Sequence, residues 1–187
     1  MSFFVHGIGT ASPPFRISQA ASVALASKYG STSDEQRRQL RALYRLTRVQ
    51  SRRSVVLDSD NPDGSTTLQF FPPPTDAADR GPTTADRMAR YESDAPPLAA
   101  SAAKAALADA GWAPDSITHV VTVSCTGFAA PSVDVGLMRM LGLRRTVART
   151  HIGFMGCHGA LNGLRAARGY AEASPDARVL VCAVELC

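Results

Sequence analysis

The chain has 187 residues, of which 45% are hydrophobic and 19% charged, and its formal net charge is +4. A chain of this length usually forms one domain, and this composition excludes an intrinsically disordered, collagen-like or low-complexity class. No stretch reaches the roughly 18 apolar residues of a membrane-spanning helix. The first residues lack the basic and long apolar segments of a secretory signal, so we expect a cytoplasmic protein without a membrane span.

The first 53 residues contain signals for one strand and two helices. A short strand is predicted over residues 2–9 and a helix over residues 17–29, which Gly30 would end. Two overlapping capping boxes, Thr32 with Glu35 and Ser33 with Gln36, predict the start of a second helix. One buried face of that helix is predicted from apolar and small residues at helical spacing, namely Leu40, Leu43, Tyr44 and Thr47.

The same helix carries a basic stripe, formed by Arg37, Arg41, Arg45, Arg48 and Arg52. Arginines at this spacing occur most often as a solvated helix face. They also suit bidentate contact with phosphate groups, so the more specific hypothesis is a binding site for a phosphorylated ligand. Nucleic acid is a further candidate partner, although a net charge of +4 is a modest excess for that class.

Residues 58–84 are polar and rich in proline and predict an excursion over the surface, after which residues 84–91 resume a helix. Pro96 and Pro97 suit the first turn of a new helix, which Gly111 would end. From there strands and helices alternate, with strands over 117–124, 146–152 and 178–184 and helices over 133–141 and 158–173. This alternation predicts a layered α/β fold with a mostly parallel central sheet between helices. The last strand is an almost continuous apolar run, which predicts burial on both faces, and its place at the end of the chain suggests that part of the fold is missing.

Cys157 is the strongest candidate for a catalytic residue. It lies between Gly156 and Gly159, with only His158 intervening, where a strand turns into a helix. The free N–H groups and the positive end of the dipole at a helix N-terminus stabilise a thiolate and an oxyanion, which suits a nucleophile that accepts an acyl group. The alternative is a small cysteine buried in the core.

The remaining titratable residues give weaker signals. Cys182 is expected to be structural, and Cys125 to lie in the core or in a pocket wall. His158 diverges from Cys157 on the helix, and His151 approaches the site from the preceding strand, so neither is a strong candidate for a catalytic base. No Cys-x-x-Cys pair or zinc-ligand spacing of histidines occurs, so no metal site is predicted.

From Ile8 to its last residue, except across residues 58–82, the chain resembles the type III polyketide synthases, the chalcone/stilbene synthase family of the thiolase fold. The resemblance is carried by the order and spacing of short motifs. These are Gly-Thr-Ala-Ser-Pro at 9–13, Ile-Thr-His-Val-Val at 117–121, Ser-Cys-Thr-Gly at 124–127, Pro-Ser-Val-Asp at 131–134, Met-Leu-Gly-Leu-Arg at 140–144, Gly-Cys at 156–157 and Arg-Val-Leu-Val-Cys at 178–182.

The resemblance implies a function and a set of site residues. Members load an acyl-CoA starter on the cysteine that corresponds to Cys157 and extend it by decarboxylative condensation with malonyl-CoA, without a further cofactor. It implies that Thr126, Ala130 and Cys187 lie at substrate-binding positions, and that the basic helix corresponds to the CoA-phosphate-binding helix, with Arg41, Arg45 and Arg48 as candidates. It also implies a homodimer formed through this half of the fold.

The chain departs from the family pattern in one respect. The family's catalytic triad is Cys-His-Asn, and its His and Asn belong to a second half for which these 187 residues have no counterpart. We therefore expect residues 1–187 to form an incomplete N-terminal thiolase-like domain that needs a C-terminal half for condensation, which a separate chain could supply. Two alternatives remain: a sister condensing enzyme of the β-ketoacyl carrier-protein synthase III or hydroxymethylglutaryl-CoA synthase type, and a non-catalytic fragment or dimerisation module.

Overall fold

The computed structural model describes residues 3–31, 33–60, 68–72, 74–76 and 78–186. The chain divides into two compact units, each of which is described by itself. The first unit comprises Met1–Ala11 and Ala85–Cys187, and the second comprises Ser12–Thr84. The first unit contains the central sheet, and the second contains the basic helix.

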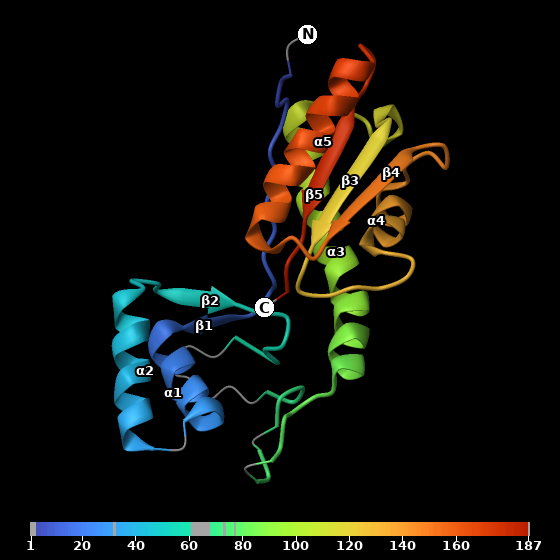
Figure 1. Cartoon of the computed structure of the whole chain (residues 1–187). Helices are drawn as coiled ribbons and strands as arrows, with labels where there is room; N and C mark the ends of the chain where they lie inside the picture. Colours follow the sequence, from blue (N-terminus) through green and yellow to red (C-terminus); the bar gives the residue numbers. More distant parts are fainter. Residues whose placement is uncertain (1–2, 32, 61–67, 73, 77, 187) are drawn as a thin grey trace. The chain divides into compact units, whose positions relative to one another are not determined.

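The second unit pairs two helices with a small antiparallel ladder (Figure 1). Its elements are β1 (Arg16–Ser18), α1 (Gln19–Gly30), α2 (Asp34–Leu46) and β2 (Ser51–Arg53). The predicted capping box is confirmed at Ser33 and Gln36, where side chain and backbone satisfy each other at the start of α2. Thr32, the first residue of the other predicted box, lies outside the described residues.

The predicted buried face of α2 is wrong. No residue of α2 is buried, and Leu43 and Leu46 are exposed. The small core of this unit is built instead around Ile17, Ala21 and Leu57. The amphipathic pattern of α2 is real, but α1 covers its apolar side only in part: Leu40 and Tyr44 are half-buried, whereas Leu43 and Thr47 are exposed.

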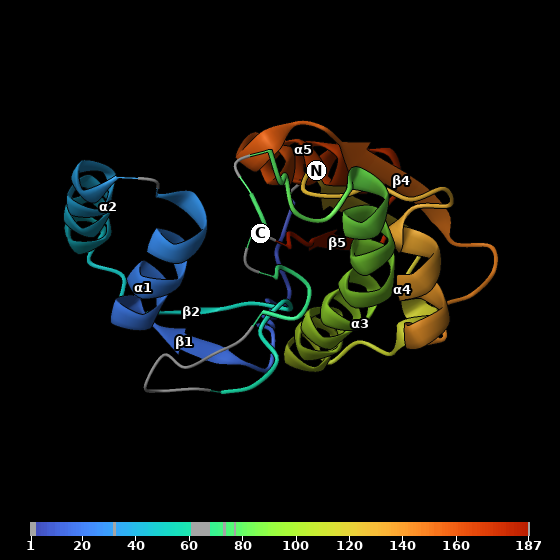
Figure 2. The same cartoon turned by 90° about the horizontal axis from the view of Figure 1, so that it is seen from below.

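The first unit is a three-layered α/β arrangement, as the sequence predicts. Its elements are α3 (Thr84–Ala110), β3 (His119–Ser124), α4 (Val133–Leu141), β4 (Ala148–Gly153), α5 (Gly159–Ala173) and β5 (Val179–Ala183), with 3-10 turns at Pro114–Ser116 and Gly156–His158. The three strands are parallel in the order β4-β3-β5, with Val121 opposite both Thr150 and Val181. Helices α3 and α4 cover one face of the sheet and α5 covers the other (Figure 2).

The alternation of side chains along β3 explains these layers. Val120 points into a core shared with Ala99 and Ala103 of α3 and with Leu137 of α4. Val121 and Val123 point the opposite way, where they meet α5 at Gly163 and Gly159. A Cβ atom at Gly163 would stand 2.9 Å from Val123, so the lack of a side chain lets α5 pack closely on the sheet.

The predicted break at the proline pair does not occur. Helix α3 runs through Pro96 and Pro97 without interruption. A proline inside a helix removes a backbone hydrogen bond and usually breaks or kinks it. Here Pro96 packs against Gly136 of α4, and the alanines that follow it lie in the core, so tertiary contacts offset the local cost.

Two further predictions are corrected at the edge of the sheet. Residues 3–9 run as an extended trace but belong to no sheet. In β5, Leu180 and Cys182 are buried, whereas Val179 and Val181 are only half-buried, so the expected burial on both faces is wrong. Among the described residues β5 has a neighbouring strand along one edge only, so the side chains of its half-buried face stay partly open to solvent beside the other edge.

In the described part of the chain, no helix combines the length and the hydropathy that spanning a membrane requires.

Candidate active site

Cys157 lies in the 3-10 turn Gly156–His158, immediately before α5. Its side chain is exposed and forms no disulfide. Gly156 has a φ of +58°, a left-handed conformation in which glycine is unstrained, and Gly159 starts α5 with its backbone close to Val123. The turn therefore presents the thiol at the N-terminal end of a helix that is packed tightly on the central strand.

A second segment of the site follows the neighbouring strand. Ser124, the last residue of β3, lies opposite Gly153, the last residue of β4, in the parallel ladder. Because carboxyl ends of parallel strands share one edge of the sheet, the segment after β3 and the segment that leads to Cys157 leave the sheet at the same edge. The exposed rings of Phe128 and Phe154, one from each segment, lie 5.9 Å apart.

Glu185 fixes the segment after β3 from the end of β5. Its carboxylate accepts hydrogen bonds from the backbone N–H groups of Cys125 and Thr126, each at 2.9 Å, and from the Thr126 hydroxyl at 2.6 Å. The Thr126 oxygen in turn accepts a bond from the N–H of Leu186 at 2.9 Å. A single carboxylate therefore ties together two strand ends that are about 60 residues apart in sequence.

We expect the Glu185→Ala variant to lose roughly 1–2 kcal/mol of unfolding free energy, because it leaves two N–H groups and a hydroxyl without their charged acceptor. Glu185→Gln keeps one acceptor oxygen and is expected to lose about half of that. Chemical denaturation of the three proteins measures the difference. Equal stability of the alanine variant and the parent chain would show that water replaces the carboxylate fully.

The Tyr91 ring packs against the same segment. It belongs to α3 and is 4% exposed, and its ring occupies the space next to Gly127, where a Cβ atom would stand 2.2 Å from the ring. Burial raises the pKa of the Tyr91 hydroxyl, and the nearby charge of Glu185 raises it further. The segment that begins at Cys125 is thus held by the Glu185 carboxylate and by contact with the buried Tyr91 ring.

The far end of this segment is anchored at the start of α4. Ala130 is exposed and precedes Pro131 through a cis peptide bond. The Ser132 hydroxyl donates to Asp134, and the buried Asp134 carboxylate also pairs with Arg149 of β4 at 3.2 Å. These contacts fix the point at which the chain enters α4.

The structure separates the predicted site residues into three groups. Cys157, Thr126 and Ala130 belong to the first unit and lie in the segments that leave this edge of the sheet. Arg41, Arg45 and Arg48 belong to the second unit, where all three are exposed and, within the described residues, pair with no carboxylate. Cys187 lies outside the described residues.

Cys182, His151 and His158 each have an identifiable partner. Cys182 is 5% exposed and points into the core, where its thiol lies 3.8 Å from the carbonyl of Ala99. The Nδ1 atom of His151 on β4 forms a hydrogen bond of 2.9 Å with the buried Thr122 hydroxyl. The Nε2 atom of His158 lies 3.5 Å from the guanidinium group of Arg165. In the described part of the chain, three or more His, Cys, Asp or Glu side chains nowhere gather into a metal site.

Burial raises the pKa of the Cys182 thiol to about 11. At pH 8 this thiol therefore stays protonated and unreactive, whereas the exposed Cys157 meets the reagent freely. We expect iodoacetamide at pH 8 to label Cys157 in the folded chain and to spare Cys182 until the chain is unfolded in guanidinium. Peptide mapping by mass spectrometry checks this, and early labelling of Cys182 would contradict its burial.

Glu185 is one of two site residues that the sequence does not predict, and Tyr91 is the other. Its only local signal is a charged residue directly after a buried apolar strand. Its partners lie on a different strand, so only the register of β3 and β5 brings them within hydrogen-bond distance. Tyr91 was missed for the same reason, because its partner Gly127 lies across a helix–sheet interface.

Comparison with known proteins agrees with this geometry. The family model for chalcone and stilbene synthases, N-terminal domain, matches residues 3–187. Pks18 of Mycobacterium tuberculosis, an alpha-pyrone synthesis polyketide synthase-like protein, is 32% identical over 185 residues, which are 98% of this chain and 44% of that protein. Bisdemethoxycurcumin synthase of Oryza sativa is 34% identical over 97% of this chain and 44% of its own length.

Solved structures agree as well. The C-terminal type III polyketide synthase domain of Steely1 from Dictyostelium superposes with a TM-score of 0.81 at 31% identity, over 98% of this chain and 48% of that domain. CsyB, solved in complex with CoA-SH, gives a TM-score of 0.77 at 28% identity, over 96% of this chain and 45% of its own. The chain thus spans less than half the length of these relatives. With a family model that matches almost every residue and with the layered α/β fold of these structures, the chain belongs to the chalcone and stilbene synthase family of type III polyketide synthases, of which it represents the N-terminal domain.

Proposed function

We propose that this chain is the nucleophile-bearing half of a type III polyketide synthase and that Cys157 accepts the acyl group of an acyl-CoA starter. The observation that carries the proposal is the exposed thiol of Cys157 at the N-terminal end of α5. The family membership supports it, and so does the relative CsyB, which was solved with CoA-SH.

The proposed loading step is a transthioesterification. The Cys157 sulfur attacks the thioester carbonyl, a new carbon–sulfur bond forms, and the bond to the CoA sulfur breaks, so that CoA leaves as its thiol with the proton that Cys157 gave up. Negative charge develops on the carbonyl oxygen during this step. The free N–H groups at the start of α5 are the chain's own groups for stabilising it.

The remaining site residues have supporting parts in this proposal. Thr126, Ala130 and Cys187 would line the cavity that holds the acyl chain, and Glu185 would keep Thr126 in place. Arg41, Arg45 and Arg48 would bind the CoA phosphates, for which three exposed guanidinium groups on one helix and its end are well suited. The reaction needs no cofactor beyond its CoA thioester substrates.

Extension by decarboxylative condensation with malonyl-CoA is proposed for the complete enzyme. The family resemblance assigns the triad's His and Asn to a C-terminal half, so loading belongs to this domain and condensation to both halves together. We also propose a homodimer through this half. The cytoplasm is the proposed location, because acyl-CoA thioesters are available there.

Intact-protein mass spectrometry after incubation with an aromatic or long-chain acyl-CoA tests the loading step. We expect a mass increase of one acyl group, which peptide mapping assigns to Cys157. A folded chain that acquires no adduct would contradict loading by this half alone, and an adduct on Cys125 instead would contradict the choice of nucleophile.

A further inference from the structure

Phe154 has an unusual backbone conformation shortly before Cys157. Its φ is +58°, and among the described residues other than glycine only Arg48 shares a positive φ. A residue with a Cβ atom is strained in this left-handed region, whereas glycine is not. The Phe154 side chain is also 75% exposed, so burial does not account for the strain. Strain of this kind persists only where the surrounding structure imposes it, and such positions gather at functional sites.

The turn that carries Cys157 is fixed at both ends. Gly153 ends β4 opposite Ser124 in the parallel ladder. Gly159 starts α5 so close to Val123 that a Cβ atom would stand 2.7 Å from its side chain. Because both ends are held by the sheet, the direction of the thiol is set by the backbone conformations between them.

The backbone between these ends reverses through three unusual conformations. Phe154 and Gly156 are both left-handed with φ of +58°, and Met155 lies in the sparsely populated bridge region with φ of −97° and ψ of 3°. Gly156 adopts its conformation without strain, but Phe154 does not. A return of residue 154 to an ordinary φ of about −60° would rotate the following chain by roughly 120° about the N–Cα bond. The position of Cys157 therefore depends on Phe154.

The ring of Phe154 is held by the segment that follows β3. Its centroid lies 5.9 Å from that of Phe128, with 53° between the ring planes, which is a favourable aromatic arrangement. The N–H of Phe128 donates to the Met88 sulfur of α3 at 3.4 Å. The preceding residue, Gly127, lies against the Tyr91 ring of the same helix. Phe154 thus contacts a segment that is itself anchored on α3, and this contact holds the strained backbone in place.

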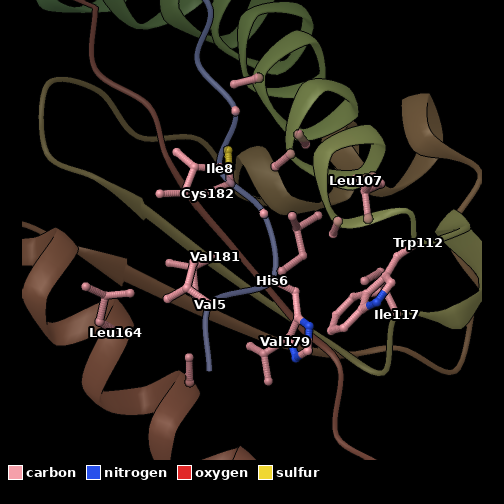
Figure 3. A pocket seen from close by; sticks show the side chains of 18 of the residues that line it. Val5, His6, Ile8, Leu107, Trp112, Ile117, Leu164, Val179, Val181 and Cys182 are labelled. Atoms are coloured by element: carbon pink, nitrogen blue, oxygen red, sulfur yellow. The ribbon is translucent and has the colours of Figure 1, made fainter. Parts of the chain in front are cut away.

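A cavity of about 420 Å³ beside β5 takes no part in this turn (Figure 3). Residues of α3, α5, β5 and the N-terminal segment line it, whereas Phe128, Phe154 and Cys157 do not. Substitutions in the aromatic pair therefore leave the lining of the cavity unchanged.

We infer that Phe154 is a positioning residue for the Cys157 thiol and that it acts through the contact of its ring with Phe128. This role rests on the proposed function, in which Cys157 is the acyl acceptor. The locked turn keeps the sulfur beside the free N–H groups at the start of α5, which stabilise the negative charge on a carbonyl oxygen under attack. Without the ring contact the turn relaxes, and the thiol leaves that position while it stays exposed.

Two reagents that make different demands on the thiol test this positioning. The sulfur attacks 4-nitrophenyl acetate at its carbonyl: a carbon–sulfur bond forms, 4-nitrophenolate leaves, and the thiol proton passes to the buffer. An oxyanion forms on the way and needs hydrogen-bond donors. Iodoacetamide is attacked at a saturated carbon, from which iodide leaves, so no oxyanion forms. Mass spectrometry of the Cys157 peptide gives both rate constants, and the ratio of acylation to alkylation reports the position of the thiol.

We expect Phe154→Ala to lower this ratio about 10-fold, with the alkylation rate constant unchanged within about 2-fold. Phe128→Ala should have the same effect, because it removes the other ring, and the double variant should lose no more than either single variant. Phe154→Tyr keeps the ring and should keep the ratio. Met140→Ala removes an exposed apolar side chain from α4 and is the matched control, for which we expect the ratio of the parent chain.

The strain at residue 154 is tested without any chemistry at Cys157. Glycine tolerates the left-handed conformation and alanine does not, so we expect Phe154→Gly to unfold at a higher urea concentration than Phe154→Ala. The reverse order would show that residue 154 is not left-handed in solution and would overturn the inference.

Three further outcomes would overturn it. These are an equal fall of both rate constants in Phe154→Ala, an unchanged ratio in that variant, and a tyrosine variant with the low ratio of the alanine variant. Neither reagent contains CoA, so the failure of the proposed function is seen separately. The expected ratios in a chain that gains no acyl group from acyl-CoA would refute loading by this half and support the positioning role.

Discussion

Replacement of Cys157 by alanine is expected to abolish acyl transfer from acyl-CoA to this chain. The thiol is the atom that would form the new thioester, so removing it eliminates the covalent step, and a loss of at least about 1000-fold in the loading rate is expected. The fold should be unaffected, because the side chain is exposed and makes no packing contact in the core. Intact-protein mass spectrometry of the parent chain and the variant, after timed incubation with the same acyl-CoA, gives the two loading rates.

Cys182→Ala is the matched control for this experiment. Its thiol is buried on the α3 side of β5, so the variant loses packing, at a cost of roughly 1–2 kcal/mol in stability, and keeps its loading rate. Equal loading of the Cys157 and Cys182 variants would refute Cys157 as the nucleophile. Loss of loading in both would point to a requirement for the packing around β5.

Gly127→Ala is expected to cause a large loss of stability. A Cβ atom at this position would stand 2.2 Å and 2.3 Å from two ring atoms of Tyr91, and the ring is 4% exposed and has no room to move. Overpacking of this kind usually costs 1–3 kcal/mol, and we expect about 3 kcal/mol here because a buried ring and a tethered loop oppose each other. Urea denaturation with a fixed slope measures the loss.

A double-mutant cycle separates this clash from a general intolerance of the loop. In a Tyr91→Leu background the added methyl group gains space, so the cost of Gly127→Ala should fall by at least about 1 kcal/mol. Gly169→Ala on α5 is the control, because no atom lies within 4 Å of its added Cβ, and we expect it to be neutral or stabilising by up to about 1 kcal/mol. An unchanged cost in the leucine background would remove the Tyr91 ring as the cause.

Features of this protein that depend on neighbouring residues could be predicted from the sequence. Ser33 and Gln36 form their capping box within a single turn, and Gly142 ends α4 in a left-handed conformation with φ of +67°. The β-branched run of β3 and the position of Cys157 just before α5 follow from the same local rules. The apolar periodicity also gave the layered α/β class, because alternating strands and helices have few ways to bury their apolar faces.

Features that depend on partners far along the chain could not be predicted, because they follow from packing between distant segments. Helix α3 continues through Pro96 because α4 packs against it, and α2 leaves Leu43 exposed because no described residue of its unit covers that side chain. Glu185 meets Thr126 only through the register of two strands, and β5 lines a cavity on the side where the described residues supply no strand. Propensity and periodicity indicate which surface of a helix or strand is apolar. Which other element covers that surface depends on packing between segments that lie far apart in the sequence.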